Sequence, residues 1–121
     1  MQLCTLARSL GSYSYRYAHE PQLHDRLAEV LTAQPVAFER ERSIDAKNRL
    51  DFLVAGGIAL EVKVDGSLAQ ALRQIDRYAA LDDVAAVLLA TTQRWGDGCV
   101  SNRATFHGKP FKMVRLRRQA V

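Results

Sequence analysis

Two acidic side chains and a lysine, Asp51, Glu61 and Lys63, interrupt an otherwise apolar stretch that runs from Arg49 to Val64. Two carboxylates held close together repel, so each resists ionisation unless a positive charge lies between them. A divalent cation supplies such a charge, because Mg²⁺ accepts carboxylate and carbonyl oxygens and completes its shell with water. A metal-bound water beside a lysine is a nucleophile suited to phosphodiester hydrolysis. This chemistry requires a fold that brings the two acids together.

The stretch predicts two strands joined by a glycine-containing loop. Strict alternation in the second strand places its acid and its lysine on one face. A two-residue turn at Gly56-Gly57 would set Asp51 opposite Val62, with the acids on opposite sides of the sheet. A three-residue loop over 55–57 sets Asp51 opposite Glu61, keeps the apolar residues paired, and uses a glycine for the positive φ that such loops need. We expect this second register, with Cβ atoms about 4.5–5.5 Å apart.

The same residues also fit a simpler description. A half-exposed strand ordinarily carries Glu and Lys on its solvent face, and Asp51 would then be a polar residue at the strand edge. The hairpin alone leaves both descriptions open, so the choice between them depends on the surrounding elements.

The surrounding pattern predicts a mixed α/β domain. Pro21 suits the first turn of a helix, and Ser67 suits a helix N-cap. Apolar spacing supports both helices, and a continuous apolar run predicts a central strand buried on both faces. In chain order we expect a helix, three strands, a helix and a strand, at about 20–33, 35–44, 49–54, 58–64, 67–81 and 84–93. Residues 1–17 form a helix or an extended arm, 94–98 form a loop, and 99–121 add strands and a basic tail.

The composition excludes several classes of protein. With 121 residues, 48% hydrophobic and 25% charged, the chain is an ordinary globular domain. Its apolar runs are well short of the roughly 18 residues of a membrane span, so we expect no membrane partner. The N-terminus lacks the pattern of a cleaved signal. Cys4 and Cys99 have no metal-ligand spacing; they indicate reduced thiols in a cytoplasmic protein, with a disulfide as the alternative.

The charge pattern allows an anionic partner. The net charge is +4, and basic residues gather between Arg40 and Arg49 and between Arg115 and Arg118. Such clusters favour nucleic acid, although a solubilising surface explains them as well. Trp95 fits either a base-stacking residue or an anchor of the core.

Asp51 followed, after nine residues, by Glu61-Val62-Lys63 resembles the D…ExK pattern of the PD-(D/E)XK nuclease superfamily. Gln74 and Tyr78 have the Q-x-x-x-Y spacing that resembles RecB-like members. The predicted order of elements is also similar to the core of that superfamily. The likeness covers residues 20–92, and it departs from the family's name where Leu50 replaces the proline before the aspartate.

The resemblance implies a single restriction-endonuclease-like α/β domain over residues 1–121, with a mixed sheet flanked by helices. It implies a metal-dependent endodeoxyribonuclease that uses Mg²⁺ or Mn²⁺. Asp51 and Glu61 would be metal ligands, with the Val62 carbonyl as a third. Lys63 would orient the attacking water and stabilise charge on the phosphate.

Two further positions carry over from the family. Glu20 matches the acid that many members place on the first helix, where it joins the metal shell directly or through water; Glu29, later on the same helix, is its rival. Gln74 would contact metal-bound water or phosphate. His19, His24 and His107 share no ligand spacing, and we expect surface or helix-capping roles for them.

The small size and the basic ends resemble the junction-resolving branch of the superfamily. That branch implies a homodimer acting on branched DNA in recombination, repair or phage DNA processing in the cytoplasm. The residues expected to contact DNA are Arg40, Arg42, Lys47, Arg49, Arg73, Arg77, Arg115, Arg117 and Arg118. Two alternatives stay open: a catalytically inactive nuclease-fold module that binds nucleic acid or protein, and a plain α/β interaction domain.

Overall fold

The computed structural model describes residues 2–97 and 105–119. Its helices are α1 (Leu3–Gly11), α2 (Glu20–Thr32), α3 (Leu68–Ala79) and the short 3₁₀ helix η1 (Arg94–Asp97). Its strands are β1 (Ser14–Arg16), β2 (Phe38–Ser43), β3 (Arg49–Val54), β4 (Ile58–Lys63), β5 (Ala86–Thr91), β6 (Thr105–Phe106), β7 (Lys109–Arg115) and β8 (Arg117–Gln119). From α2 to β5 the order is the helix, three strands, helix and strand expected from the sequence.

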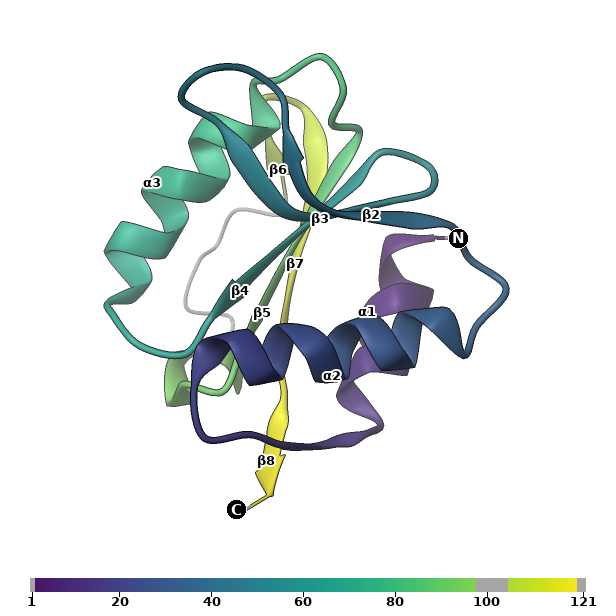
Figure 1. Cartoon of the computed structure of the whole chain (residues 1–121). Coiled ribbons are helices and arrows are strands. Elements are labelled where there is room, and N and C mark those ends of the chain that lie inside the picture. The colour runs from purple at the N-terminus through teal and green to yellow at the C-terminus, as the bar shows by residue number, and fades with distance from the viewer. Residues whose placement is uncertain (1, 98–104, 120–121) are drawn as a thin grey trace.

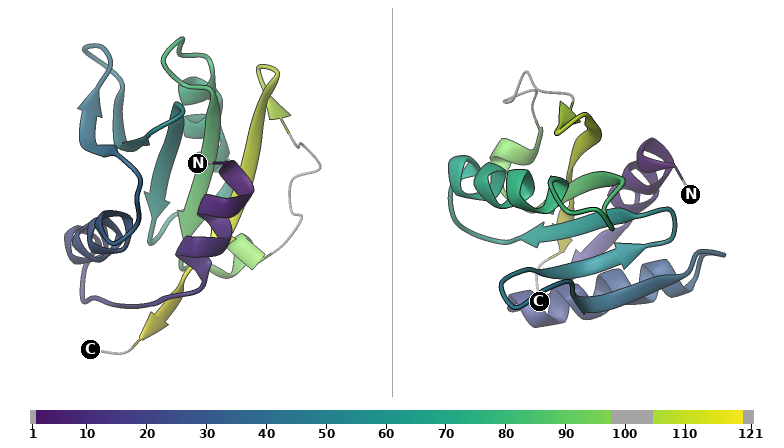
Figure 2. Two further views of the ribbon diagram at one scale, coloured as in Figure 1. Left: turned by 90° about the vertical axis from the view of Figure 1, so that its right-hand side faces the viewer. Right: turned by 90° about the horizontal axis from the view of Figure 1, so that it is seen from above.

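Six strands form one mixed sheet in the order β2-β3-β4-β5-β7-β6 (Figure 1). The strands β4, β5 and β7 run parallel, whereas β2, β3 and β6 run antiparallel to their neighbours. Seen from above in Figure 2, the strands lie between α3 on one side and α2 on the other. The expectation of a mixed α/β fold is confirmed.

The core has two parts, one on each face of the sheet. The helices α1 and α2 pack on one face, where Leu60 and Leu88 lie; this is the α2-side core. Helix α3 packs on the other face with Ala59 and Leu89; this is the α3-side core. All six residues of β5 are buried, as the apolar run predicted for a strand covered on both faces.

Both long helices begin where the sequence predicts. Pro21 lies in the first turn of α2. At α3, the Ser67 hydroxyl accepts a hydrogen bond from the Gln70 amide (3.2 Å), and the Gln70 side chain accepts one from the Ser67 amide (3.3 Å). This capping box satisfies two N–H groups that a helix N-terminus otherwise leaves without partners.

The segments left open by the sequence are ordered elements. Residues 1–17 supply both α1 and β1, and the expected loop after β5 contains η1. The strand β8 pairs in parallel with β1 as a separate two-stranded sheet. Cys99 and most of the strand expected at 100–106 lie outside the described residues. Among the helices of residues 2–97 and 105–119, none is long and apolar enough to cross a membrane.

Candidate active site

The hairpin of β3 and β4 has the register that brings the acids together. Its pairs are Phe52–Leu60, Leu53–Ala59 and Val54–Ile58. The three-residue loop ends at Gly57, whose φ is 79°. The prediction of a three-residue loop is therefore confirmed, and the paired residues end at Phe52 and Leu60, the neighbours of Asp51 and Glu61.

The strand β3 changes direction at Asp51. Regular alternation would place Leu50 and Phe52 on one face of the sheet. Instead Leu50 packs in the α3-side core and Phe52 in the α2-side core. On the neighbouring strand, Glu41 has a φ of 50°, a left-handed conformation that disturbs the ladder opposite Asp51. The distortion leaves the Asp51 side chain at the point where β3 and β4 separate.

Asp51 is held by the strand it faces. Its Oδ2 accepts a hydrogen bond from the Val62 amide at 2.9 Å. The same oxygen lies 4.0 Å from Nε2 of His24, and the aspartate side chain is 25% exposed. Asp51 thus connects β4 to helix α2 while keeping partial access to solvent.

Glu61 is buried, with only 2% of its surface exposed. Its Oε2 lies 3.2 Å from Nζ of Lys63, whereas its buried Oε1 has no hydrogen-bond partner among the described residues. Burial raises the pKa of Glu61 to about 9; the Asp51 carboxylate adds to this rise and Lys63 opposes it. At neutral pH, with no cation bound, Glu61 therefore holds a proton.

Gln74 lies beside this site but is directed at Tyr78. Its Nε2 donates to the Tyr78 hydroxyl at 2.7 Å, and that hydroxyl donates to the Arg49 carbonyl at 3.0 Å. Burial raises the pKa of Tyr78, and the nearby Glu61 carboxylate raises it further. The glutamine amide is thus engaged with the tyrosine, and a contact with metal-bound water or phosphate stays a prediction.

Helix α2 presents a histidine to the site. His24 is 15% exposed, and its buried Nε2 has no hydrogen-bond partner among the described residues. The surface or capping role expected for His24 is wrong, because the ring packs against Phe52 beside Asp51. One signal was available in the sequence: His24 follows Leu23 in the apolar stripe and lies one turn after Glu20.

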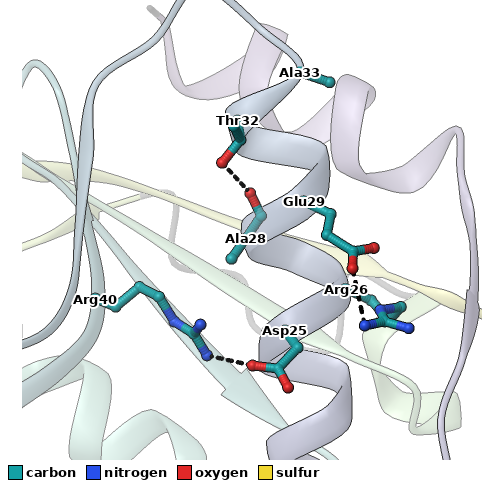
Figure 3. A pocket seen from close by; sticks show the side chains of 7 residues that line it. All are labelled: Asp25, Arg26, Ala28, Glu29, Thr32, Ala33 and Arg40. Carbon is teal, nitrogen blue, oxygen red and sulfur yellow. Dashed lines mark hydrogen bonds and ion pairs between the residues drawn. The ribbon is translucent and has the colours of Figure 1, made fainter.

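The two acids considered for the first helix have different surroundings. Glu20 is a half-buried residue at the start of α2, and its role as a ligand stays a prediction. Glu29 is exposed and pairs with Arg26 at 2.8 Å on the outer side of α2 (Figure 3). That side lines a shallow pocket which also includes Asp25 and Arg40, 3.0 Å apart. None of the pocket's residues belongs to the Asp51–Glu61 pair.

The donor set fits a hydrated divalent cation better than an enclosed metal centre. Within residues 2–97 and 105–119, no group of three or more His, Cys, Asp or Glu side chains is placed to hold a metal ion. Two adjacent carboxyl groups are present, and one buried oxygen of Glu61 has no partner. Mg²⁺ is commonly bound by one or two carboxylates, with water and substrate phosphate completing its shell. The Val62 carbonyl stays a predicted third ligand.

Side chains from the segment after β5 contact the backbone that follows Lys63. The side chain of Gln93 donates to the Val64 carbonyl, and Nε1 of Trp95 lies 3.4 Å from the Gly66 carbonyl. Trp95 is half-buried and packs against the α3-side core, which favours the anchoring role over base stacking. These contacts hold the segment that follows the lysine.

The basic residues expected to contact DNA fall into two groups. Near the site, Lys47 and Arg49 lie on the tip of the β2–β3 hairpin, and Arg73 and Arg77 lie on α3. Arg77 donates to the Asn48 side chain at 3.3 Å, which joins the helix to the hairpin tip. This group is exposed, and Arg49, two residues before Asp51, lies 4.0 Å from Glu41.

The other basic residues expected to contact DNA also have partners within the protein. Arg40 pairs with Asp25, Arg42 with Glu39, and Arg115 with Asp97. Arg117 donates to the Ser12 carbonyl at 2.7 Å, and Arg118 donates to the Tyr17 carbonyl at 2.9 Å. The last two arginines thus hold β8 against the N-terminal segment.

Comparison of the chain with protein-family models, with curated proteins and with solved structures finds no match. The geometry around Asp51 and Glu61 is therefore the basis for a functional assignment.

Proposed function

We propose that the chain is a divalent-metal-dependent DNA endonuclease of the PD-(D/E)XK type. The observation that carries the proposal is the buried Glu61 carboxyl beside Asp51, with Lys63 3.2 Å away and one carboxyl oxygen without a partner. Burying Glu61 beside the Asp51 carboxylate costs free energy that a plain structural role does not recover. The cost is explained if the pair holds a cation.

Asp51 and Glu61 would bind the metal, with the Val62 carbonyl as a third ligand. From α2, Glu20 is the predicted additional ligand, and His24 offers a buried nitrogen beside Asp51. When bound, Mg²⁺ or Mn²⁺ polarises the phosphate and lowers the pKa of its water. Glu61 must give up its proton before the pair can hold the cation, because the charged carboxylate is the ligand.

Lys63 has two consecutive tasks in this proposal. Without a metal ion its Nζ lies 3.2 Å from Oε2 of Glu61 and opposes the rise in the pKa of that buried carboxyl. With substrate present it would place positive charge at the phosphate and orient the attacking water. The mobility this requires fits a side chain that is 28% exposed.

The substrate that we propose is branched DNA, cut by a homodimer in recombination, repair or phage DNA processing. The basic group at the hairpin tip and on α3 supports a phosphate-contacting rim beside Asp51. Branch selectivity rests on the resemblance to small junction-resolving nucleases.

The test is a cleavage assay on a fluorescent four-way junction and a linear duplex of matched sequence, with Mg²⁺, Mn²⁺ or EDTA. Asp51→Asn and Lys63→Met should each abolish metal-dependent cleavage. Asp82→Asn and Lys112→Met change the same residue types at exposed positions and should retain it. Cleavage of the junction alone supports a resolvase, and equal cleavage of both substrates supports a general endonuclease.

The alternative is an inactive nuclease-fold module that binds nucleic acid or protein. Two observations favour it: Lys63 is already paired with Glu61, and the described residues include no group of three metal-binding side chains. Salt-dependent DNA binding by folded protein, with no cleavage under any of these conditions, would replace the enzyme with this module.

A further inference from the structure

Helix α3 makes two hydrogen bonds to the residues just before Asp51. The Arg49 carbonyl, two residues ahead of the aspartate, accepts the hydrogen bond of the Tyr78 hydroxyl at 3.0 Å. The adjacent Asn48 side chain accepts one from Arg77 at 3.3 Å. Two successive residues near the end of α3 therefore bond to Asn48, just before β3, and to Arg49, the first residue of β3.

The tyrosine is itself fixed in place. Tyr78 is only 3% exposed and packs in the α3-side core with Ile75 and Leu50. Its hydroxyl accepts from the Gln74 side chain at 2.7 Å while donating to the Arg49 carbonyl. With a donor and an acceptor both engaged, the hydroxyl has a defined orientation.

These two hydrogen bonds account for the position of Asp51. They hold Leu50 on the α3 side, although Phe52 continues on the α2 side. Between them the Asp51 carboxylate meets the Val62 amide at 2.9 Å. The aspartate is thus fixed at two points, at its carboxylate by β4 and at its backbone, two residues earlier, by α3.

We propose that Tyr78 is a positioning residue, whose hydroxyl, oriented by Gln74, fixes the Arg49 carbonyl and so sets the Asp51 carboxylate on the Val62 amide beside Glu61. Its value for cleavage rests on the proposed nuclease function. The positioning itself is a property of the free protein, with neither metal nor DNA present.

The test measures amide hydrogen exchange of Val62 in Tyr78→Phe, in metal-free buffer. The phenylalanine keeps the buried ring and removes only the hydroxyl. The Val62 amide reports on the docked carboxylate, and the Leu89 amide at the centre of β5 reports on global stability. We expect Val62 exchange to accelerate roughly 3- to 10-fold beyond the change at Leu89, the range for loss of one such hydrogen bond.

Tyr15→Phe is the matched control. Tyr15 is also buried, and its hydroxyl also donates to a backbone carbonyl, that of Leu10 at 2.6 Å. It belongs to the α2-side core, away from α3. Its loss should accelerate Val62 and Leu89 equally. Asp51→Ala, measured in parallel, gives the exchange rate of Val62 when the side-chain acceptor is removed.

Equal acceleration of both amides in Tyr78→Phe would overturn the proposal, as would a variant that no longer folds, since Tyr78 would then support the whole domain. Where the wild type cleaves DNA, Tyr78→Phe should lower kcat and leave KM unchanged. If exchange at Val62 accelerates selectively in Tyr78→Phe but the wild type never cleaves DNA, the positioning role of Tyr78 stands and the nuclease function is rejected. Full kcat in Tyr78→Phe with unchanged exchange would reject the positioning alone.

Discussion

Nζ of Lys63 lies 3.2 Å from Oε2 of Glu61, two residues earlier on the same strand. The buried carboxyl therefore has a cation on one strand and, across the hairpin, the carboxylate of Asp51. These two neighbours act on Glu61 with opposite sign: Asp51 raises its pKa and Lys63 lowers it.

Removing the charge of Asp51 and removing the charge of Lys63 should therefore move the pKa of Glu61 in opposite directions. Asp51→Asn removes the neighbouring negative charge and should lower it, whereas Lys63→Met removes the cation and should raise it. Carbon-detected NMR titration of the Glu61 carboxyl in metal-free buffer measures both. Asp82→Asn is the control and should leave the value unchanged. A shift in the same direction for both variants would contradict the charge arrangement.

The stability of the metal-free protein should fall as pH rises. The pKa of Glu61 is about 9 in the folded state against an ordinary value of 4.5, so below pH 4.5 both states hold the proton. Between these values the unfolded chain releases it while the folded chain keeps it. Glu61 then lowers the unfolding free energy by at most about 1.4 kcal/mol per pH unit.

Urea unfolding of the wild type and Glu61→Gln across pH 5 to 8 isolates this contribution, because glutamine resembles the protonated acid and does not titrate. The difference in unfolding free energy between the two proteins should change steadily with pH. A constant difference would mean that Glu61 titrates near its ordinary value.

Helix α2 should contribute to metal affinity through His24. Mn²⁺ should raise the melting temperature of the wild type, since a ligand that binds only the folded state stabilises it. His24→Ala should reduce this rise more than Glu20→Gln, because Nε2 of His24 lies 4.0 Å from the Asp51 carboxylate. Glu29→Gln, on the outer side of the helix, is the control. If Glu20→Gln were the only variant in which Mn²⁺ no longer raises the melting temperature, Glu20 would be the metal ligand that the family resemblance implies.

Arg118 should act on stability. Its guanidinium donates to the Tyr17 carbonyl and lies 4.3 Å from the centre of the Tyr17 ring. Arg118→Ala should lower the unfolding free energy by about 1–2 kcal/mol. Arg118→Lys should recover only part, since an ammonium group lacks the planar stacking of guanidinium. Arg73→Ala, at an exposed position on α3, should leave stability unchanged. Wild-type stability in Arg118→Ala would contradict this structural role and leave Arg118 among the residues expected to contact DNA.

Local patterns predicted the hairpin and α3 because the information lies within a few residues. Alternation and the glycines of the loop determined the register that pairs Phe52 with Leu60, and Ser67 with Gln70 determined the start of α3. The position of His24 depends instead on how α2 crosses β3. The partner of Gln74 depends on how α3 meets the hairpin tip. Neither angle is encoded in a short stretch of sequence.

The roles of the C-terminal arginines were hidden for a related reason. Arg117 and Arg118 belong with Arg115 to a short basic cluster, a pattern shared by nucleic-acid contacts and by solubilising surfaces. Their backbone partners lie about one hundred positions earlier. No local pattern reports a pairing at that separation.

The pairing of Ser14 with Arg117 joins the two ends of the described chain, with the entire large sheet between them in sequence. During synthesis β1 must therefore wait for its partner until almost all of the domain has left the ribosome. Contacts between residues so far apart in sequence slow folding. The small sheet should thus form after the large one.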